Sequence, residues 1–405
     1  MRIAVFIPLA SCQYIIARIC ASCYNEFMEM QREPDWKSII VRLPWLALLP
    51  VGILLPRFAS AHTEAMERYA ETAYPIIKDV ISSITSLLPI SLAEALLYAL
   101  CIGIPLLLLS RLILLLVRRI SAARFCNTVL SVLIAVGIGW NLFYVTWGFN
   151  YFRVPLSERM GLAVELRPAE ELEQLTREIA GAAAHVRARL PEDENGVFTQ
   201  NAEDRKLLFS LLTDCYAELA ETSHVFSGKV TQAKEVEWSE GLSRLGIAGI
   251  YIGLTAEPNV NVHQPALLVY QGAAHEMAHQ LGIASEDAAE FAGILACLAS
   301  DRPEIVYSGL MGALLRCGNA LSETEPDSYR AIRAGYSTAM RRDLDAYNAY
   351  WKRYDGPAET AASAANDRYL KHNAQQSGIK SYGESVDLLL AYHATENILA
   401  NIKVF

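Results

Sequence analysis

Long apolar runs fill the first part of the chain and end near Arg153. Residues 125–152 contain no charged side chain, and residues 95–117 are interrupted only by Arg111. Because a helix needs about 20 apolar residues to cross the hydrocarbon of a bilayer, both runs predict transmembrane helices. The run 43–56 has only 14 residues and includes three prolines. It would span only with bilayer thinning and snorkelling of its flanking arginines, so it is a third candidate span.

The loop between the two longer runs is rich in arginine, with Arg118, Arg119 and Arg124. Positive charge in short loops marks the cytoplasmic side, so the chain after Phe152 is expected outside. The segment 59–93 is mildly acidic and contains an amphipathic stretch, which predicts that it lies at the outer surface. We therefore expect a multi-pass cell-membrane protein, with the lipid bilayer as one partner and an extracytoplasmic domain.

The leader 1–36 allows two interpretations. Its sequence LASC at 9–12 matches a lipoprotein cleavage signal, but the apolar run before it is too short for the core of a signal peptide. An amphipathic leader, or a start codon chosen too far upstream, is the alternative that we favour. Residues 37–152 then form the membrane region, and residues 153–405 form the domain that follows it.

After residue 153 the pattern becomes that of a globular, mostly helical domain. The segment 247–254 (IAGIYIGL) is the best strand candidate, and its edge would offer a place where an extended peptide can add. The fold class expected is mainly α, with transmembrane helices followed by a helical α+β zincin-like domain that contains a small sheet with an exposed edge. Helical spacing of apolar residues is found over 168–190, 203–221, 264–281, 286–299, 303–317, 327–353 and 382–399.

Charge and cysteine content exclude two classes of protein. The chain has 35 basic and 44 acidic residues, a net charge of −9, and the negative excess comes entirely from the part after residue 150, which carries −12 against +3 for the part before it. A nucleic-acid partner is not expected, because such binders present a basic face. Only three of the eight cysteines follow residue 150, widely spaced, so they form neither a disulfide framework nor a zinc-ribbon pattern.

The motif that carries chemistry is H-E-x-x-H at residues 275–279. On the last turns of a predicted helix, His275 and His279 project from one face and can share one metal ion. Zinc is the expected cofactor, since imidazole suits it and a catalytic site keeps one position for water. Glu276 would take the proton of that zinc-bound water as it attacks a peptide carbonyl, which makes it the predicted catalytic base.

A third protein ligand is expected just after the motif. Gly282 permits a sharp reversal, and Ser285 is a suitable N-cap for a following helix. Glu286 and Glu290 share one face of that helix, and either could reach the metal. Glu286 is preferred because it lies nearest to His279 and because the polarised helix N-terminus keeps its carboxylate ionised. Glu290 would be better aimed if the first side chain of the helix points away from the turn.

Several blocks of sequence together resemble a known family of bacterial membrane proteins catalogued as domain of unknown function 3810. The resemblance extends from about Arg42 to the C-terminus, and it implies N-terminal spans followed by a zinc-peptidase-like domain of the gluzincin type. The blocks are WGFNYFRVPL (147–156), LTAEPNVN (254–261), HEMAHQLGIASEDAAEF (275–291), NDRYLKHN (366–373) and SYGESVDLLL (381–390).

The chain departs from the family pattern after the motif. Family members usually read like E-x-E-A-N-F there, whereas this chain has Glu286 at the first acid, Ala288 at the second and Glu290 in place of the Asn. If the family's ligand is the first acid, the site is intact; if it is the second, Glu290 must substitute or the site is impaired. Tyr382, in the SYG block, is a candidate hydrogen-bond donor to the oxyanion.

Two functions follow from these features. The leading hypothesis is a membrane-anchored zinc metallopeptidase that acts on a peptide or protein substrate. The alternative is a catalytically impaired zincin-like sensor or interaction module, which the Ala288 departure leaves open. Loss of peptide-bond cleavage in Glu276→Gln would separate the two.

Overall fold

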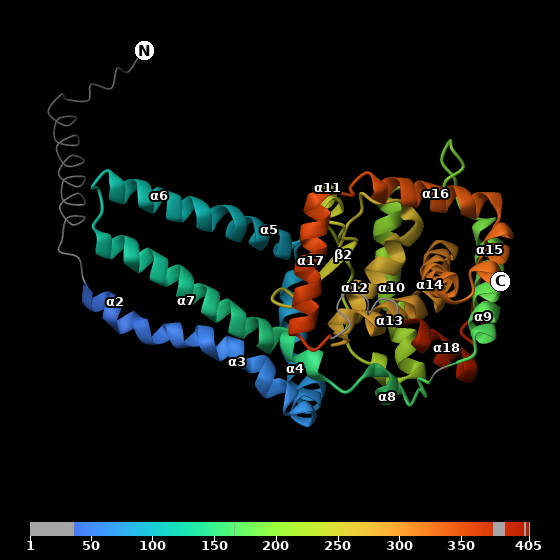
Figure 1. Cartoon of the computed structure of the whole chain (residues 1–405), viewed down its shortest axis with the longest axis horizontal. Helices are drawn as coiled ribbons and strands as arrows, with labels where there is room; N and C mark the ends of the chain where they lie inside the picture. Colours follow the sequence, from blue (N-terminus) through green and yellow to red (C-terminus); the bar gives the residue numbers. More distant parts are fainter. Residues whose placement is uncertain (1–35, 166, 376–384, 401, 405) are drawn as a thin grey trace, which may run out of the picture. The chain divides into compact units, whose positions relative to one another are not determined.

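The computed structural model describes residues 36–165, 167–375, 385–400 and 402–404 (Figure 1). The leader, apart from Trp36, and the candidate Tyr382 lie outside the described residues. The chain divides into two compact units. The first comprises Met1–Gly52 and Leu97–Asn141, and the second comprises Ile53–Leu96 and Leu142–Phe405.

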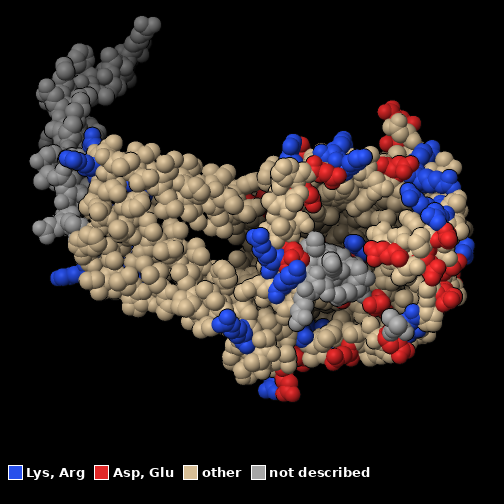
Figure 2. Space-filling model, viewed as in Figure 1, with Lys and Arg blue, Asp and Glu red and all other residues tan. Residues whose placement is uncertain are grey.

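Among the described residues, three helical stretches are long and apolar enough to cross a membrane: Trp36–Ser60, Leu92–Leu116 and Ala122–Thr146. The run 43–56 is therefore part of a 25-residue helical stretch, which removes the difficulty of its length. The surface of the three stretches carries few charged side chains (Figure 2). The stretches consist of α2 (Trp36–Arg42), η1 (Leu43–Ala47) and α3 (Leu48–Ser60); of α5 (Leu92–Tyr98), η2 (Ala99–Gly103) and α6 (Ile104–Leu116); and of α7 (Ala122–Thr146).

The second unit is mostly helical and packs around two central helices, α12 (Val269–Gln280) and α13 (Glu286–Leu298). Almost every residue of both helices is buried, in keeping with the alanines and other small or apolar residues that their own sequences carry on every face. The other helices are α4 (Thr63–Thr85), η3 (Gly148–Phe152), α8 (Leu156–Met160), α9 (Ala169–Arg187), α10 (Ala202–Thr222), η4 (His224–Phe226), α11 (Ser239–Arg244), η5 (Ala266–Leu268), α14 (Pro303–Thr324), α15 (Pro326–Ala334), α16 (Thr338–Lys352), α17 (Pro357–His372) and α18 (Ser385–Glu396).

A three-stranded sheet lies beside α12. It contains β1 (Lys234–Glu235), β3 (Glu257–Val260) and β2 (Gly249–Ile252) in the order β1-β3-β2, with β2 antiparallel and β1 parallel to β3. The predicted strand at 247–254 is confirmed as β2, shortened at both ends. Within the described residues β2 is an edge strand, so one side of its main chain is not paired with another strand.

One helical prediction is wrong and one helix is missing from the predictions. The segment 327–353 forms two helices rather than one, because the chain turns at Gly335 and Ser337 caps α16 by accepting a hydrogen bond from the main-chain N–H of Met340. Helix α17 was not predicted, since its alanine-rich sequence lacks a clear apolar periodicity. The remaining predicted helices are present, with ends shifted by a few residues.

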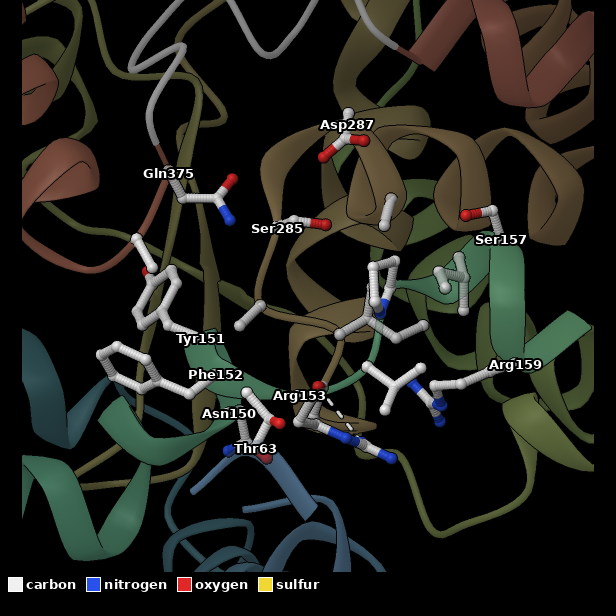
Figure 3. Close-up of a pocket in the computed structure, with 18 of the residues that line it drawn as sticks. Thr63, Asn150, Tyr151, Phe152, Arg153, Ser157, Arg159, Ser285, Asp287 and Gln375 are labelled. Atoms are coloured by element: carbon white, nitrogen blue, oxygen red, sulfur yellow. Dashed lines mark hydrogen bonds between the residues drawn. The ribbon is translucent and has the colours of Figure 1, made fainter. Parts of the chain in front are cut away.

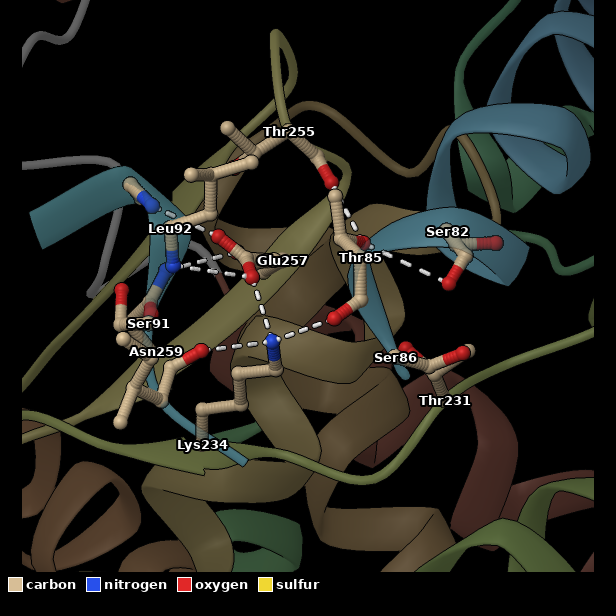
Figure 4. A network of polar contacts seen from close by, with 12 residues as sticks. Ser82, Thr85, Ser86, Ser91, Leu92, Thr231, Lys234, Thr255, Glu257 and Asn259 are labelled. Atoms are coloured by element: carbon tan, nitrogen blue, oxygen red, sulfur yellow. Dashed lines mark hydrogen bonds and ion pairs between the residues drawn. The ribbon is translucent and has the colours of Figure 1, made fainter. Parts of the chain in front are cut away.

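A buried ion pair joins the sheet to the start of α5 (Figure 4). Glu257 on β3 accepts hydrogen bonds from the main-chain N–H groups of Leu92 at 3.1 Å and Ala93 at 2.7 Å. Lys234 on β1 donates to Glu257 at 2.5 Å and to the carbonyl of Ile90 at 2.9 Å. Each charge is thus paired and hydrogen-bonded, which is the condition under which a buried ion pair is tolerated.

Candidate metal and catalytic site

The H-E-x-x-H motif occupies the last turns of α12, as predicted. The helix ends at Gln280, and Gly282 follows with a φ of +73°, a left-handed conformation that glycine adopts without strain. The reversal brings the chain back after three more residues, and α13 begins at Glu286 with Ser285 before it. The local structure therefore places the two histidines opposite the first turn of the next helix.

The structure brings His275, His279 and Glu286 together. Their ligand atoms all lie within 4.8 Å of one another, and all three side chains are buried. The distance from Glu286 Oε2 to His275 Nε2 is 3.2 Å, and to His279 Nε2 it is 3.9 Å. Zinc bonds of about 2.0–2.1 Å in a tetrahedral arrangement separate ligand atoms by roughly 3.3 Å. The donor set and its spacing thus fit a zinc ion.

The second nitrogen of each imidazole has its own partner. His279 Nδ1 lies 2.7 Å from the carbonyl oxygen of Ile283, and His275 Nδ1 lies 3.4 Å from Glu290 Oε2. Arg316 Nε in turn donates to Glu290 Oε1 at 2.9 Å. Such contacts fix a histidine's orientation and leave Nε2 for a metal. Glu290 therefore faces the outer nitrogen of His275, whereas Glu286 faces the inner nitrogens.

Burial and nearby carboxylates shift the ionisation of this cluster. Burial acts to lower the pKa of His275, but the contacts with Glu286 and Glu290 outweigh it and raise that pKa to about 10. Burial lowers the pKa of His279 to about 4 and raises that of Glu276 to about 8. Burial also acts to raise the pKa of Glu290, but Arg316 and His275 lower it to about 2. The carboxylates thus favour the protonated, positively charged form of His275.

The carboxylate of Glu276 lies against the unpaired side of β2. The main-chain N–H of Asn261 bonds to the carbonyl of Ala248, so alternate residues of the β2 segment pair with β3, and Gly249 and Tyr251 direct their main-chain groups outward. A hydrogen bond joins the main chain of Tyr251 to Glu276. The predicted base is thus held at the edge of the sheet, where an extended peptide would add.

Gly249 leaves the space that Glu276 occupies. A Cβ at position 249 would lie 2.7 Å from Glu276 Oε1 and 2.8 Å from its Cγ. We expect Gly249→Ala to displace the carboxylate and, for the peptidase activity proposed below, to lower kcat/KM about 10–100-fold without a change in zinc affinity. The matched control is Gly272→Ala on α12, where a Cβ meets nothing within 4 Å. Equal activity of the two variants would contradict the assigned position of Glu276.

Aromatic residues distant in sequence surround the second histidine. The Trp147 ring lies edge-on to the His279 ring, with centroids 5.4 Å apart. The Tyr74 hydroxyl lies 3.3 Å from the carbonyl of His279 and 3.3 Å from the Tyr251 hydroxyl. Sequence reasoning assigned none of these residues, nor Arg316, to the site. The WGFNYF block, already singled out by its resemblance, was the available signal for Trp147.

A cavity of about 550 Å³ lies beside the turn between α12 and α13 (Figure 3). Arg153 and Arg159 line its lower part in this view, and Asp287 lies at the upper part. Arg153 donates to the carbonyl of Gly282 at 3.3 Å and pairs with Glu67 at 2.6 Å. The four predicted site residues do not line the cavity. Arg153 in its lining instead holds the turn between α12 and α13, and this turn positions the site residues.

Comparison with known proteins identifies the family of the chain. No curated protein and no solved structure matches the chain. A family model described as protein of unknown function (DUF3810) matches residues 69–390, which is most of the chain and includes the described site. The chain therefore belongs to the DUF3810 family.

Proposed function

We propose that the protein is a membrane-anchored zinc metallopeptidase whose domain lies outside the cytoplasm. One observation carries the proposal: two imidazoles and the Glu286 carboxylate converge within 4.8 Å, next to a glutamate held at the edge of a sheet. Metal-assisted hydrolysis needs such a donor set together with a base. A buried cluster of charged residues that served only to stabilise the fold would not need a carboxylate such as Glu276 at the unpaired edge of a strand.

Each residue has a distinct role in the proposed reaction. Zinc, when bound by His275, His279 and Glu286, would polarise the substrate carbonyl and lower the pKa of water in the site. The main-chain groups of Gly249 and the carbonyl of Tyr251 hold the substrate in an extended conformation, while the N–H of Tyr251 bonds to Glu276. Glu276 accepts the proton of the attacking water and delivers it to the leaving amine. Tyr382 stays a candidate oxyanion donor from the sequence alone.

The test uses the purified full chain in detergent, with zinc content measured alongside digestion of a mixed peptide library. We expect about one zinc per chain and cleavage of a subset of peptides. Glu276→Gln is expected to retain zinc and to lose cleavage by at least about 100-fold, as removal of a general base does. The control is Glu203→Gln, an exposed carboxylate on α10. Cleavage that is unchanged in Glu276→Gln would not arise at this site, and it would reject the proposed peptidase.

The alternative of an impaired binding module rested on Ala288. In the structure Ala288 lies on α13 and lines the cavity of Figure 3, while Glu286 faces both histidines. The first acid of the family pattern thus lies within 3.9 Å of both imidazoles, which supports an intact site. A chain that binds zinc but cleaves no peptide in the library would favour the binding module.

A further inference from the structure

Helix α4 exposes an apolar face over its second half. Ile76, Val80 and Ile84 are spaced by four residues, and Leu87 follows in the next turn of chain. Each is more than half exposed. Residues four apart share one side of a helix, so Ile76, Val80 and Ile84 form a continuous surface, and Leu87 follows it in the turn after α4. These four residues are here called the apolar stripe. An exposed apolar patch of this kind usually marks an interaction site.

Other exposed hydrophobic residues belong to segments attached near the stripe. Leu254, at the tip of the β2–β3 hairpin, is partly exposed, and the next carbonyl, that of Thr255, accepts a hydrogen bond from Thr85 Oγ1 on α4 at 3.0 Å. Trp238 is half exposed, and its main-chain N–H donates to Glu94 on α5 at 2.8 Å. Exposed tryptophan near the end of an apolar helix is typical of the membrane interface.

The position of α4 in the chain indicates what covers the stripe. The helix lies between two stretches that are long enough to cross a membrane, one ending at Ser60 and the other beginning at Leu92. The chain therefore leaves the bilayer and returns to it within residues 61–91, and α4 fills most of that interval. An amphipathic helix in this situation lies along the lipid surface with its apolar side buried.

The opposite side of α4 contacts the proposed catalytic site. Tyr74 belongs to its buried face, and the Tyr74 hydroxyl lies 3.3 Å from the carbonyl of His279. A helix with its side chains is about 10–12 Å across. About one helix diameter thus separates the apolar stripe from the main chain of a candidate zinc ligand.

The edge strand connects the same two places. It begins at Gly249, beside Glu276, and leads to the hairpin tip at Leu254, beside α4. The strand ends at Ile252, so the five residue steps from Gly249 to Leu254 cover at most about 17 Å. A peptide paired with β2 would therefore have one end at the base and the other near the lipid surface.

We propose that the apolar stripe rests on the lipid bilayer and that the site cleaves segments of membrane-anchored proteins close to their anchor. The substrate class rests on the proposed peptidase function, whereas the lipid contact of the stripe does not. The expected substrate has roughly five residues between its membrane anchor and the cleaved bond, which is the length of β2 and the hairpin tip.

The lipid contact is tested by photocrosslinking. The full chain carries p-benzoylphenylalanine at Val80 and is reconstituted in phosphatidylcholine nanodiscs, with the same residue at Ala331, an exposed position on α15, as the matched control. Intact-mass analysis is expected to show phospholipid adducts at Val80 and at most a tenth as many at Ala331. Equal adducts at the two positions, or crosslinks of Val80 to a second copy or another protein, would overturn the lipid contact.

The substrate class is tested with the peptide cleaved fastest in the library. The peptide is anchored to vesicles that contain the full chain, through an acyl group at either end, with spacers of 5 or 20 residues. Cleavage is expected to be roughly tenfold faster with the short spacer. A rate that is equal for the two spacers, or higher with the long one, would overturn the substrate class. If no peptide is cleaved in any form, the proposed function fails, and the photocrosslinks still decide the lipid contact.

Discussion

Replacing Glu286 by glutamine is expected to weaken zinc binding by more than about 100-fold. The change removes the charged member of a three-residue donor set whose atoms lie within 4.8 Å. Loss of an outer partner of a metal ligand already costs 10–100-fold in affinity, so loss of a direct ligand should cost more. The measurement is a competition titration of the full chain against a zinc chelator, with thermal unfolding followed in parallel.

Two matched variants make this result specific. Glu290→Gln changes the partner of His275 Nδ1, which lies 3.4 Å away, and is expected to cost about 10-fold. Glu276→Gln is expected to leave zinc affinity unaltered. A larger loss in Glu290→Gln than in Glu286→Gln would make Glu290 the third ligand. Zinc affinity that survives His275→Ala would reject the metal site altogether.

Replacing Asp343 by alanine is expected to lower the free energy of unfolding by about 3–5 kcal/mol, because the buried Arg187 loses its buried carboxylate partner and keeps only the more exposed Glu192, at 3.0 Å. Asp343 on α16 accepts hydrogen bonds from Arg187 Nε at 2.5 Å and Nη2 at 3.1 Å. It also accepts from the Tyr307 hydroxyl at 2.7 Å and the Phe198 N–H at 2.8 Å. Both charged side chains are almost fully buried.

The effect is measured as a fall in the unfolding temperature of the full chain in detergent, expected at roughly 10 °C or more for a domain of this size. The control is Asp345→Ala, an exposed carboxylate on the same helix, with an expected change within about 0.5 kcal/mol. The double change Arg187→Leu and Asp343→Leu is expected to cost less than Asp343→Ala alone. Similar stability of the Asp343 and Asp345 variants would show that the pair contributes little.

The sequence predicted features whose signals are local. Apolar periodicity located α9, α10, α13 and α14, and the positions of Gly282 and Ser285 predicted the turn between α12 and α13. His275, Glu276, His279 and Glu286 lie within twelve residues of chain, so helix geometry and one turn suffice to bring them together. This is why the donor set could be anticipated from spacing alone.

Features that depend on distant parts of the chain were not predictable. Strand β3 (EPNV) carries few residues typical of strands, and it forms because Glu257 finds Lys234 and the start of α5. The orienting role of Glu290 depends on Arg316, which comes from another helix. The contact of Tyr74 with His279 joins residues 205 positions apart. The hydrophobic pattern within a short stretch of sequence contains no information on such distant pairs.

The contact between Glu257 and Leu92 has a consequence for how the protein is made. The two residues are 165 positions apart. At about 5–20 residues per second, roughly 10–30 s of synthesis separate them. During that interval the first N–H groups of α5 have no carboxylate to cap them and must bond to water or lipid headgroups. The apolar helices therefore insert before the domain folds. The N-terminus of α5 is capped only when β3 has left the ribosome and Glu257 can accept the hydrogen bonds of Leu92 and Ala93.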